Sequence, residues 1–435
     1  MTKPVATGSS AATDPAKLTA ATAYTPRERR FLLVFAVVGA LIESMELNLL
    51  SFPMRDLAAS FGVTNQQVVA AITAQSLASI VGGFLFGWIA DRYGRKPSYI
   101  LFTASYSLAA IAGSMLTDFD TFVITRVIAG VAMGGAFGVL FAMFAESWKS
   151  RKRGFMGSVL QAMFIAGQLL TQVVLFTTIS TLGSDAGWRA GFAFIGVGCL
   201  AVAIAAYFWL PESKLWQASR AAHRRDGSTA PTADNPDTDD LRGKKLAWGA
   251  VFLTICTTGV FAASYSYITF APTYLREALG VSLGISTVIL TIGTLLGIGS
   301  YIVFGALSDR VGRRRSTVYA CLVGVAGFGA FAWGSTGSAQ IGIVALMGTA
   351  IGYAGFGVLG TWISEFYPTR FRALGSNATY YVARGLGSGL YPLFALTLAG
   401  GDLRIALALG GIGAALGLIG CLFVPDTAGR TITAE

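Results

Sequence analysis

The sequence predicts an all-α membrane protein with twelve transmembrane helices in two pseudo-symmetric bundles of six. Its composition, the spacing of its apolar segments and an internal repeat all predict this class. Of its 435 residues, 54% are hydrophobic and only 12% are charged, and 54 are glycines. Soluble domains carry about 25% charged residues, and abundant glycine is typical of closely packed transmembrane helices. We therefore expect the lipid bilayer to surround the chain.

Twelve apolar segments, each long enough to cross a bilayer, recur along the chain. They cover residues 31–53, 67–90, 98–116, 119–145, 155–179, 188–210, 247–271, 283–307, 316–335, 339–363, 374–398 and 402–424. The basic residues behind the net charge of +10 gather in alternate loops, which the positive-inside rule explains better than a nucleic-acid partner does. This pattern predicts an inner (cytoplasmic) membrane protein with both termini in the cytoplasm.

One long polar connection, residues 211–246, divides the chain. We expect a cytoplasmic tail over 1–30, bundles over 31–210 and 247–424, and a second tail over 425–435. We also expect the protein to work as a monomer.

The two predicted bundles repeat each other. GWIADRYGRK begins at Gly87, and GALSDRVGRR begins 218 residues later at Gly305. A second element follows the fourth and tenth segments, with both of its charged residues repeated 219 positions later. It comprises Glu146 and Arg153 in the first half, and Glu365 and Arg372 in the second. Paired repeats of this kind build transporters around a site near the middle of the membrane.

The repeated loop resembles the signature loop of the major facilitator superfamily, and the resemblance covers nearly the whole chain. The matching residues are Gly87, Asp91, Arg92, Gly94, Arg95 and Lys96 in the first copy, and Gly305, Asp309, Arg310, Gly312, Arg313 and Arg314 in the second. The resemblance implies the major facilitator fold and a secondary transporter. It also implies that these loops latch the cytoplasmic gate and take no part in binding substrate.

Four charged residues lie deep inside the apolar segments, away from their ends, and are not repeated. They are Glu43 and Glu46 in the first segment, Arg126 in the fourth and Arg384 in the eleventh. A charge at mid-membrane costs roughly 2.5–3.5 kcal/mol, so such residues usually serve a site. The set resembles proton symporters for organic acids, including the aromatic-acid and sialate groups. Aromatic-acid relatives carry Asp-Gly-x-Asp where this chain reads Glu43-Ser-Met-Glu46, so the substrate group stays open.

Depth in the membrane predicts that Glu46 meets Arg126. Each lies seven residues from the outer end of its segment, about 10 Å deep at about 1.5 Å per residue. The resemblance implies that such a pair couples the proton. Glu43 is then either a second proton site or a residue that orients the substrate. A structural hydrogen bond between helices is the alternative. Gly130, Gly134 and Gly138 follow Arg126 at four-residue spacing and predict close packing of this helix.

Arg384 lies ten residues into its segment, near the midplane and level with Glu43. It is the best candidate for binding an anion, because its planar guanidinium fork suits a carboxylate. Asn377 and Tyr381 share its helix face, and Tyr380 adds an aromatic ring beside them. Further candidates for substrate contact or for helix packing are Gln161, Gln168 and Tyr265. Glycines at 385, 387 and 389 and Pro392 are expected to weaken the same helix beyond Arg384.

These features predict a proton-coupled symporter that imports a small organic anion, by expectation a carboxylate, through alternating access. Two alternatives stay open: a proton-coupled antiporter that exports drug-like or metabolite compounds, and a receptor on the transporter fold without turnover. We expect no enzyme, no metal and no cofactor other than the coupling proton. The chain has no Walker loop and no Cys/His cluster, and its single histidine, His223, lies in a polar loop.

Overall fold

The computed structural model describes residues 24–147, 153–214, 216–217, 240–337, 339–367 and 372–427. Within these ranges the chain forms helices joined by short connections, without a strand. Nine helical spans there are long and apolar enough to cross a membrane. They comprise α4 (Asn65–Tyr93), α5 (Arg95–Met115), α6 (Phe119–Met133) with α7 (Ala136–Ser147), α8 (Arg153–Leu182), α9 (Ser184–Trp209), α11 (Asp240–Thr273), α12 (Leu283–Val311), α13 (Arg313–Gly334) and α18 (Leu403–Ala408) with α19 (Gly410–Phe423).

Three further spans complete the predicted twelve. The first is α2 (Pro26–Leu47), followed by the short α3 (Met54–Phe61). The tenth joins α14 (Ala339–Ala350) to α15 (Phe356–Phe366) through a 3-10 turn, and the eleventh joins α16 (Arg372–Arg384) to α17 (Tyr391–Leu398). A π-helical segment, Gly385–Leu390, links the last two helices. The glycine-rich stretch predicted to weaken this span is therefore where its α-helix is interrupted.

The first span differs from its predicted bounds of 31–53. It begins at Pro26 and ends at Leu47, because Thr25 and Glu28 form a capping box that starts the helix earlier. Each side chain of this box bonds the other residue's backbone N–H, and proline is favoured at the first helical position. Helix α11 likewise begins at Asp240, seven residues before the predicted start of the second bundle. The connection predicted at 211–246 lies partly outside the described residues.

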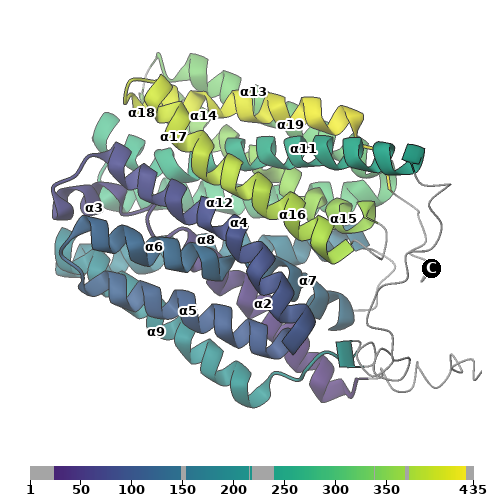
Figure 1. Cartoon of the computed structure of the whole chain (residues 1–435). Coiled ribbons are helices and arrows are strands. Elements are labelled where there is room, and N and C mark those ends of the chain that lie inside the picture. Colours follow the sequence, from purple (N-terminus) through teal and green to yellow (C-terminus); the bar gives the residue numbers. More distant parts are fainter. Residues whose placement is uncertain are drawn as a thin grey trace, which may run out of the picture.

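The helices form two groups, which we call the N-terminal half (α2–α9) and the C-terminal half (α11–α19). The N-terminal half fills the lower part of Figure 1 and the C-terminal half the upper part. They meet where α8 packs on α12 and α15, and where α4 packs on α16 and the π-helical segment. The loops at 91–95 and 309–313 lie at one end of the bundle, here called the motif end.

Close packing around the fourth span follows its predicted glycine ridge. A Cβ atom at Gly130 would lie 2.0 Å from the Gln75 carbonyl oxygen, and one at Gly134 would lie 2.4 Å from the backbone of α4. No side chain fits at either position, so the absence of a Cβ brings α6 onto α4.

Candidate functional site

The Glu46–Arg126 ion pair lies inside the N-terminal half. The Arg126 Nη1 donates to Glu46 Oε1 over 2.9 Å, and both side chains are fully buried. The Arg126 Nη2 also donates to the Ala109 carbonyl oxygen over 2.7 Å. The contact expected from the depths of the two residues is confirmed. The second oxygen of Glu46 has no hydrogen-bond partner within the described residues.

The Glu43–Arg384 ion pair joins the two halves. The Arg384 Nη1 donates to Glu43 Oε1 over 2.9 Å, and each side chain is 1% exposed. The sequence placed the two residues at one level but did not predict that they pair. Within the described residues, Glu43 Oε2 and Arg384 Nε make no hydrogen bond. A buried pair must recover several kcal/mol of desolvation per ion, so the unused donor and acceptor make this pair a poor stabilising contact.

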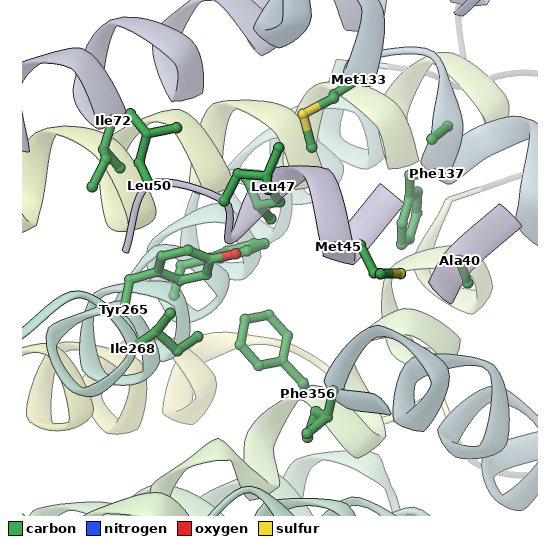
Figure 2. Close-up of a cluster of buried hydrophobic side chains, with 14 of the residues drawn as sticks. Ala40, Met45, Leu47, Leu50, Ile72, Met133, Phe137, Tyr265, Ile268 and Phe356 are labelled. Atoms are coloured by element: carbon green, nitrogen blue, oxygen red, sulfur yellow. The ribbon is translucent and has the colours of Figure 1, made fainter. Parts of the chain in front are cut away.

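A cavity of about 50 Å³ lies between the halves, close to these residues. Its lining comprises Ser44, Leu47, Asn48, Gln161, Phe164, Ile165, Gln168, Phe261, Ser264, Tyr265, Ile268, Tyr301, Phe356 and Tyr380. Side chains from α2, α11 and α15 converge on this region (Figure 2). A water molecule in a cavity needs roughly 10–15 Å³. The space therefore holds a few water molecules but is too small for an organic acid. An organic substrate requires the halves to separate.

The cavity has a polar side and an aromatic side. Gln161 Oε1, Asn48 Oδ1 and the Ser264 hydroxyl are buried without a hydrogen-bond partner among the described residues. Buried polar groups that lack a partner can form hydrogen bonds with the polar atoms of a ligand. On the aromatic side, the Phe261 ring lies edge-on to Phe356 at 4.7 Å and to Tyr380 at 5.3 Å between ring centroids.

Of the seven predicted substrate contacts, four line this cavity, and Arg384, Asn377 and Tyr381 do not. Gln161, Gln168, Tyr265 and Tyr380 belong to its lining. Asn377 and Tyr381, predicted as substrate contacts, lie away from this cavity. A Cβ at Gly138 would lie 2.7 Å from the Asn377 Oδ1, and Tyr381 bonds backbone groups of the fourth span. Both side chains therefore pack against the N-terminal half.

Sequence reasoning missed several lining residues, although a signal for two of them was present. Phe261 and Ser264 stand 218 positions after Glu43 and Glu46, which is the offset of the loop repeat. The C-terminal half thus lines the cavity at these equivalent positions with a phenyl ring and a hydroxyl, whereas Glu43 and Glu46 themselves do not line it. Ser44 and Asn48, which neighbour the acids, also line it.

At the motif end, each repeated loop turns at a glycine with positive φ, 113° at Gly94 and 97° at Gly312. Asp91 pairs with Arg95 over 3.2 Å in the first loop. In the second, Arg313 pairs with Asp309 over 2.7 Å and with Glu365 over 3.0 Å. Of the other predicted gating residues, Gly87 lies within α4, Arg92 and Arg310 are exposed, and the side chains of Glu146, Arg153 and Arg372 lie outside the described part of the structure.

Contacts between the halves occur on both sides of the cavity. At the motif end the Phe155 backbone N–H donates to Asp309 Oδ2 over 3.0 Å. At the opposite end Arg276 forms two hydrogen bonds to Asp56, of 2.5 and 3.2 Å, from α11's π-helical extension (Tyr274–Ala278) to α3. The conformation is therefore one in which the halves meet at both ends.

The family follows from comparison of the whole chain with known proteins. A sequence profile of the Major Facilitator Superfamily matches residues 32–392. The chain belongs to the Major Facilitator Superfamily.

Two curated relatives of this superfamily member are transporters. It is 24% identical over 407 residues to the probable 4-methylmuconolactone transporter of Cupriavidus pinatubonensis, which covers 91% of this chain and 90% of the relative. It is 24% identical over 405 residues to the cis,cis-muconate transport protein of Acinetobacter baylyi, covering 91% and 94%. The relatives are transporters and not enzymes, in agreement with the prediction.

Among solved structures, the facilitator resembles the proton:xylose symporter XylE bound to 6-bromo-6-deoxy-D-glucose. The TM-score is 0.73 at 20% sequence identity, and the match covers 94% of this chain and 98% of that chain. The likeness establishes the fold, with twelve helices as predicted.

In this facilitator, the two ion pairs offer two different kinds of chemistry. Arg126 is held by Glu46 and by a backbone carbonyl of the same half. Arg384 meets a carboxylate of the opposite half beside the cavity, with its Nη2 3.9 Å from the Met133 sulfur. A guanidinium that holds one carboxylate through a single hydrogen bond can exchange it for a carboxylate that makes a two-point contact. The second pair is thus the better placed to take an anion.

Proposed function

We propose that this facilitator imports a small organic carboxylate together with protons by alternating access, in the inner membrane, with its motif end and both termini in the cytoplasm. The observation that supports the proposal most is the Glu43–Arg384 pair. A carboxylate of the protein holds the buried guanidinium that joins the halves, next to a cavity with unpartnered polar groups.

In the first step of the proposed cycle, a substrate carboxylate replaces Glu43 on Arg384. A bare carboxylate released in the membrane interior would be costly, so Glu43 leaves as the neutral acid after taking a proton from the outer side. The proton on Glu43 and the negative charge of the substrate then enter together. Arg384 stays paired throughout, and the charge in the site is unchanged.

Glu46 supplies the second switch. Burial disfavours its charged form, whereas Arg126 favours that form, and the opposing effects make its protonation responsive to conformation. A proton on Glu46 would release Arg126 within the N-terminal half. A buried guanidinium without a counter-ion is costly, so protonation of Glu46 favours a conformation in which Arg126 gains another acceptor, which couples the proton to the movement.

The cavity lining favours a planar, unsaturated acid. The aromatic side, with Phe261 at its centre, would stack on a conjugated or aromatic body, while Gln161 and Ser264 would bind a second polar group. The names of the two curated relatives, which include muconate, agree with an organic acid of this kind. Arg384 argues against cationic drug-like compounds as cargo.

Purified protein in liposomes tests the proposal. A thermal-shift screen against a panel of carboxylates first identifies binders, and radiolabelled uptake of those acids is then measured with and without an inward proton gradient. The proposal expects accumulation only with the gradient. Binding without uptake would favour the receptor, and gradient-dependent export from loaded vesicles would favour the antiporter.

A further inference from the structure

The fourth span is interrupted between α6 and α7, after Met133. In a continuous α-helix the Phe137 N–H would donate to the Met133 carbonyl, four residues earlier. Here the Phe137 N–H donates to the Tyr381 hydroxyl over 2.8 Å, and that hydroxyl donates to the Met133 carbonyl over 3.2 Å. One hydroxyl group from the opposite half therefore occupies the position of a single helical hydrogen bond.

The surrounding residues leave space for this insertion. Tyr381 is 1% exposed, and a Cβ at Gly83 would lie 2.7 Å from its ring. A Cβ at Gly135, within the interruption, would lie 2.6 Å from the Phe86 side chain. Side chains inserted into the helical hydrogen-bond ladder are an established cause of kinks. The interruption thus depends on Tyr381 as well as on the local glycines.

The inserted hydroxyl is close along the chain to one residue of each ion pair. Tyr381 precedes Arg384 by three residues, and the Arg384 guanidinium carbon is 5.8 Å from its ring centroid. Met133 follows Arg126 by seven residues, two turns along α6. Met133 and Phe137, which flank the interruption, appear near each other in Figure 2. A movement of α16 away from the fourth span would therefore act on the helix that carries Arg126.

We propose that the Tyr381 hydroxyl is a removable wedge in the fourth span, that is, a group whose insertion keeps the helix interrupted. Tyr381 is thereby a positioning residue that couples the anion site to the proton pair. The coupling part rests on the proposed function. When the halves separate at this level, the hydroxyl leaves, and the Phe137 N–H and Met133 carbonyl bond each other, because buried backbone groups rarely stay unpaired. Helix α6 then straightens onto α7 and carries Arg126 away from Glu46.

A structure of the Tyr381→Phe variant by electron cryomicroscopy tests the wedge without any transport. The ring is kept and only the hydroxyl is lost. We expect the Phe137 nitrogen to lie about 2.9–3.0 Å from the Met133 oxygen, in one continuous helix. An interruption that persists in this variant would overturn the wedge. Tyr99→Phe is the matched control, because it removes a buried hydroxyl bonded over 3.2 Å to the Phe35 carbonyl within one half. The control should keep the interruption.

Transport by the same variants tests the coupling. In Tyr381→Phe we expect substrate affinity and exchange of pre-loaded substrate near the wild-type values, with gradient-driven accumulation reduced about tenfold, within the usual range of coupling between sites. The ratio of driven uptake to exchange should not change in Tyr99→Phe. Equal loss of exchange and driven uptake in Tyr381→Phe, or the same ratio change in Tyr99→Phe, would overturn the coupling role. A wild-type protein that accumulates no acid would overturn the proposed function and the coupling, while the wedge would still stand or fall on the structure.

Discussion

Glu43 and Arg384 are 341 residues apart in the chain and 2.9 Å apart in the structure, where they join the first span to the eleventh. Each is nearly inaccessible to solvent. This contact is the one buried ion pair of the described residues near mid-membrane that links the halves. An anion that binds Arg384 must first separate it, so substrate binding and the relative position of the halves share one pair of side chains.

Glu43→Gln should strengthen substrate binding at neutral pH by about tenfold. A neutral amide competes less well than a carboxylate for the guanidinium, because a charge-assisted hydrogen bond is more stabilising than a neutral one by roughly 1 kcal/mol or more. In the wild type, affinity should rise on acidification, since protonated Glu43 releases Arg384. This pH dependence should flatten in the variant. Titration calorimetry across the pH range measures both. Weaker binding with unchanged pH dependence would contradict the displacement step.

Arg384→Lys should weaken binding of the carried acid at least about tenfold, because a lysine cannot reproduce the planar two-point contact and a charge-assisted hydrogen bond is worth about 1.5–3 kcal/mol. The same calorimetric assay applies. Arg310→Lys, at an exposed position of the motif end, is the control and should bind normally. Wild-type affinity in Arg384→Lys would remove this residue from the anion site.

Glu46→Gln should abolish gradient-driven accumulation while leaving some exchange of pre-loaded substrate. The amide keeps the shape of the side chain but cannot take up a proton, so Arg126 is no longer switched. Uptake and counterflow in the same liposomes separate the two modes. Asp120→Asn, an exposed acid in the first turn of α6, should behave as wild type. Unchanged driven uptake in Glu46→Gln would exclude it from the mechanism.

The two motif-end aspartates should differ in effect. Asp91→Asn should slow transport and spare binding, because Asp91 pairs with the neighbouring Arg95. Asp309→Asn should slow it more, since Asp309 also accepts a hydrogen bond from Phe155 of the opposite half. Initial uptake rates together with affinities test this order. Equal rates in the two variants would argue against the cross-half bond as part of the gate.

At the opposite end, Asp56→Asn should favour opening of the cavity toward that side. The change removes the charge from a contact in which Asp56 receives two hydrogen bonds from Arg276, and a charge-assisted hydrogen bond of this kind contributes about 1.5–3 kcal/mol. Labelling of a cysteine introduced at Ser264, a cavity-lining position, by an impermeant reagent reports the opening. Labelling no faster than with intact Asp56 would show that this contact does not hold the end closed.

Sequence reasoning was most reliable for quantities that depend on position along one helix. Counting residues from the outer end of each segment gave the depths of Glu46 and Arg126, and the two meet. The same counting put Glu43 level with Arg384 but could not show their contact, since that depends on how far apart the halves stand. Lateral packing between halves leaves no periodic signal in either helix.

Two misplacements have specific physical causes. Asn377, Tyr381 and Arg384 do share a helix face, but that face packs on the N-terminal half and none of the three lines the cavity, so shared direction did not mean a shared site. The early start of α2 was encoded in Thr25 and Glu28, and the apolar run that begins at Phe31 obscured it. The lining residue Phe356 follows the 3-10 turn that interrupts its span. Helical periodicity restarts after that turn, so the sequence before it does not predict which way Phe356 faces.

The carboxylate of Glu43 also sets the charge of the site when no substrate is bound. With Glu43 on Arg384, the unloaded interior contains the same balance of charge as the loaded one, so reorientation without cargo exposes no unneutralised guanidinium to the lipid interior. A carrier that works in the way proposed can therefore return empty after each delivery. That property separates a protein capable of net accumulation from an obligatory exchanger, which must carry a solute in both directions.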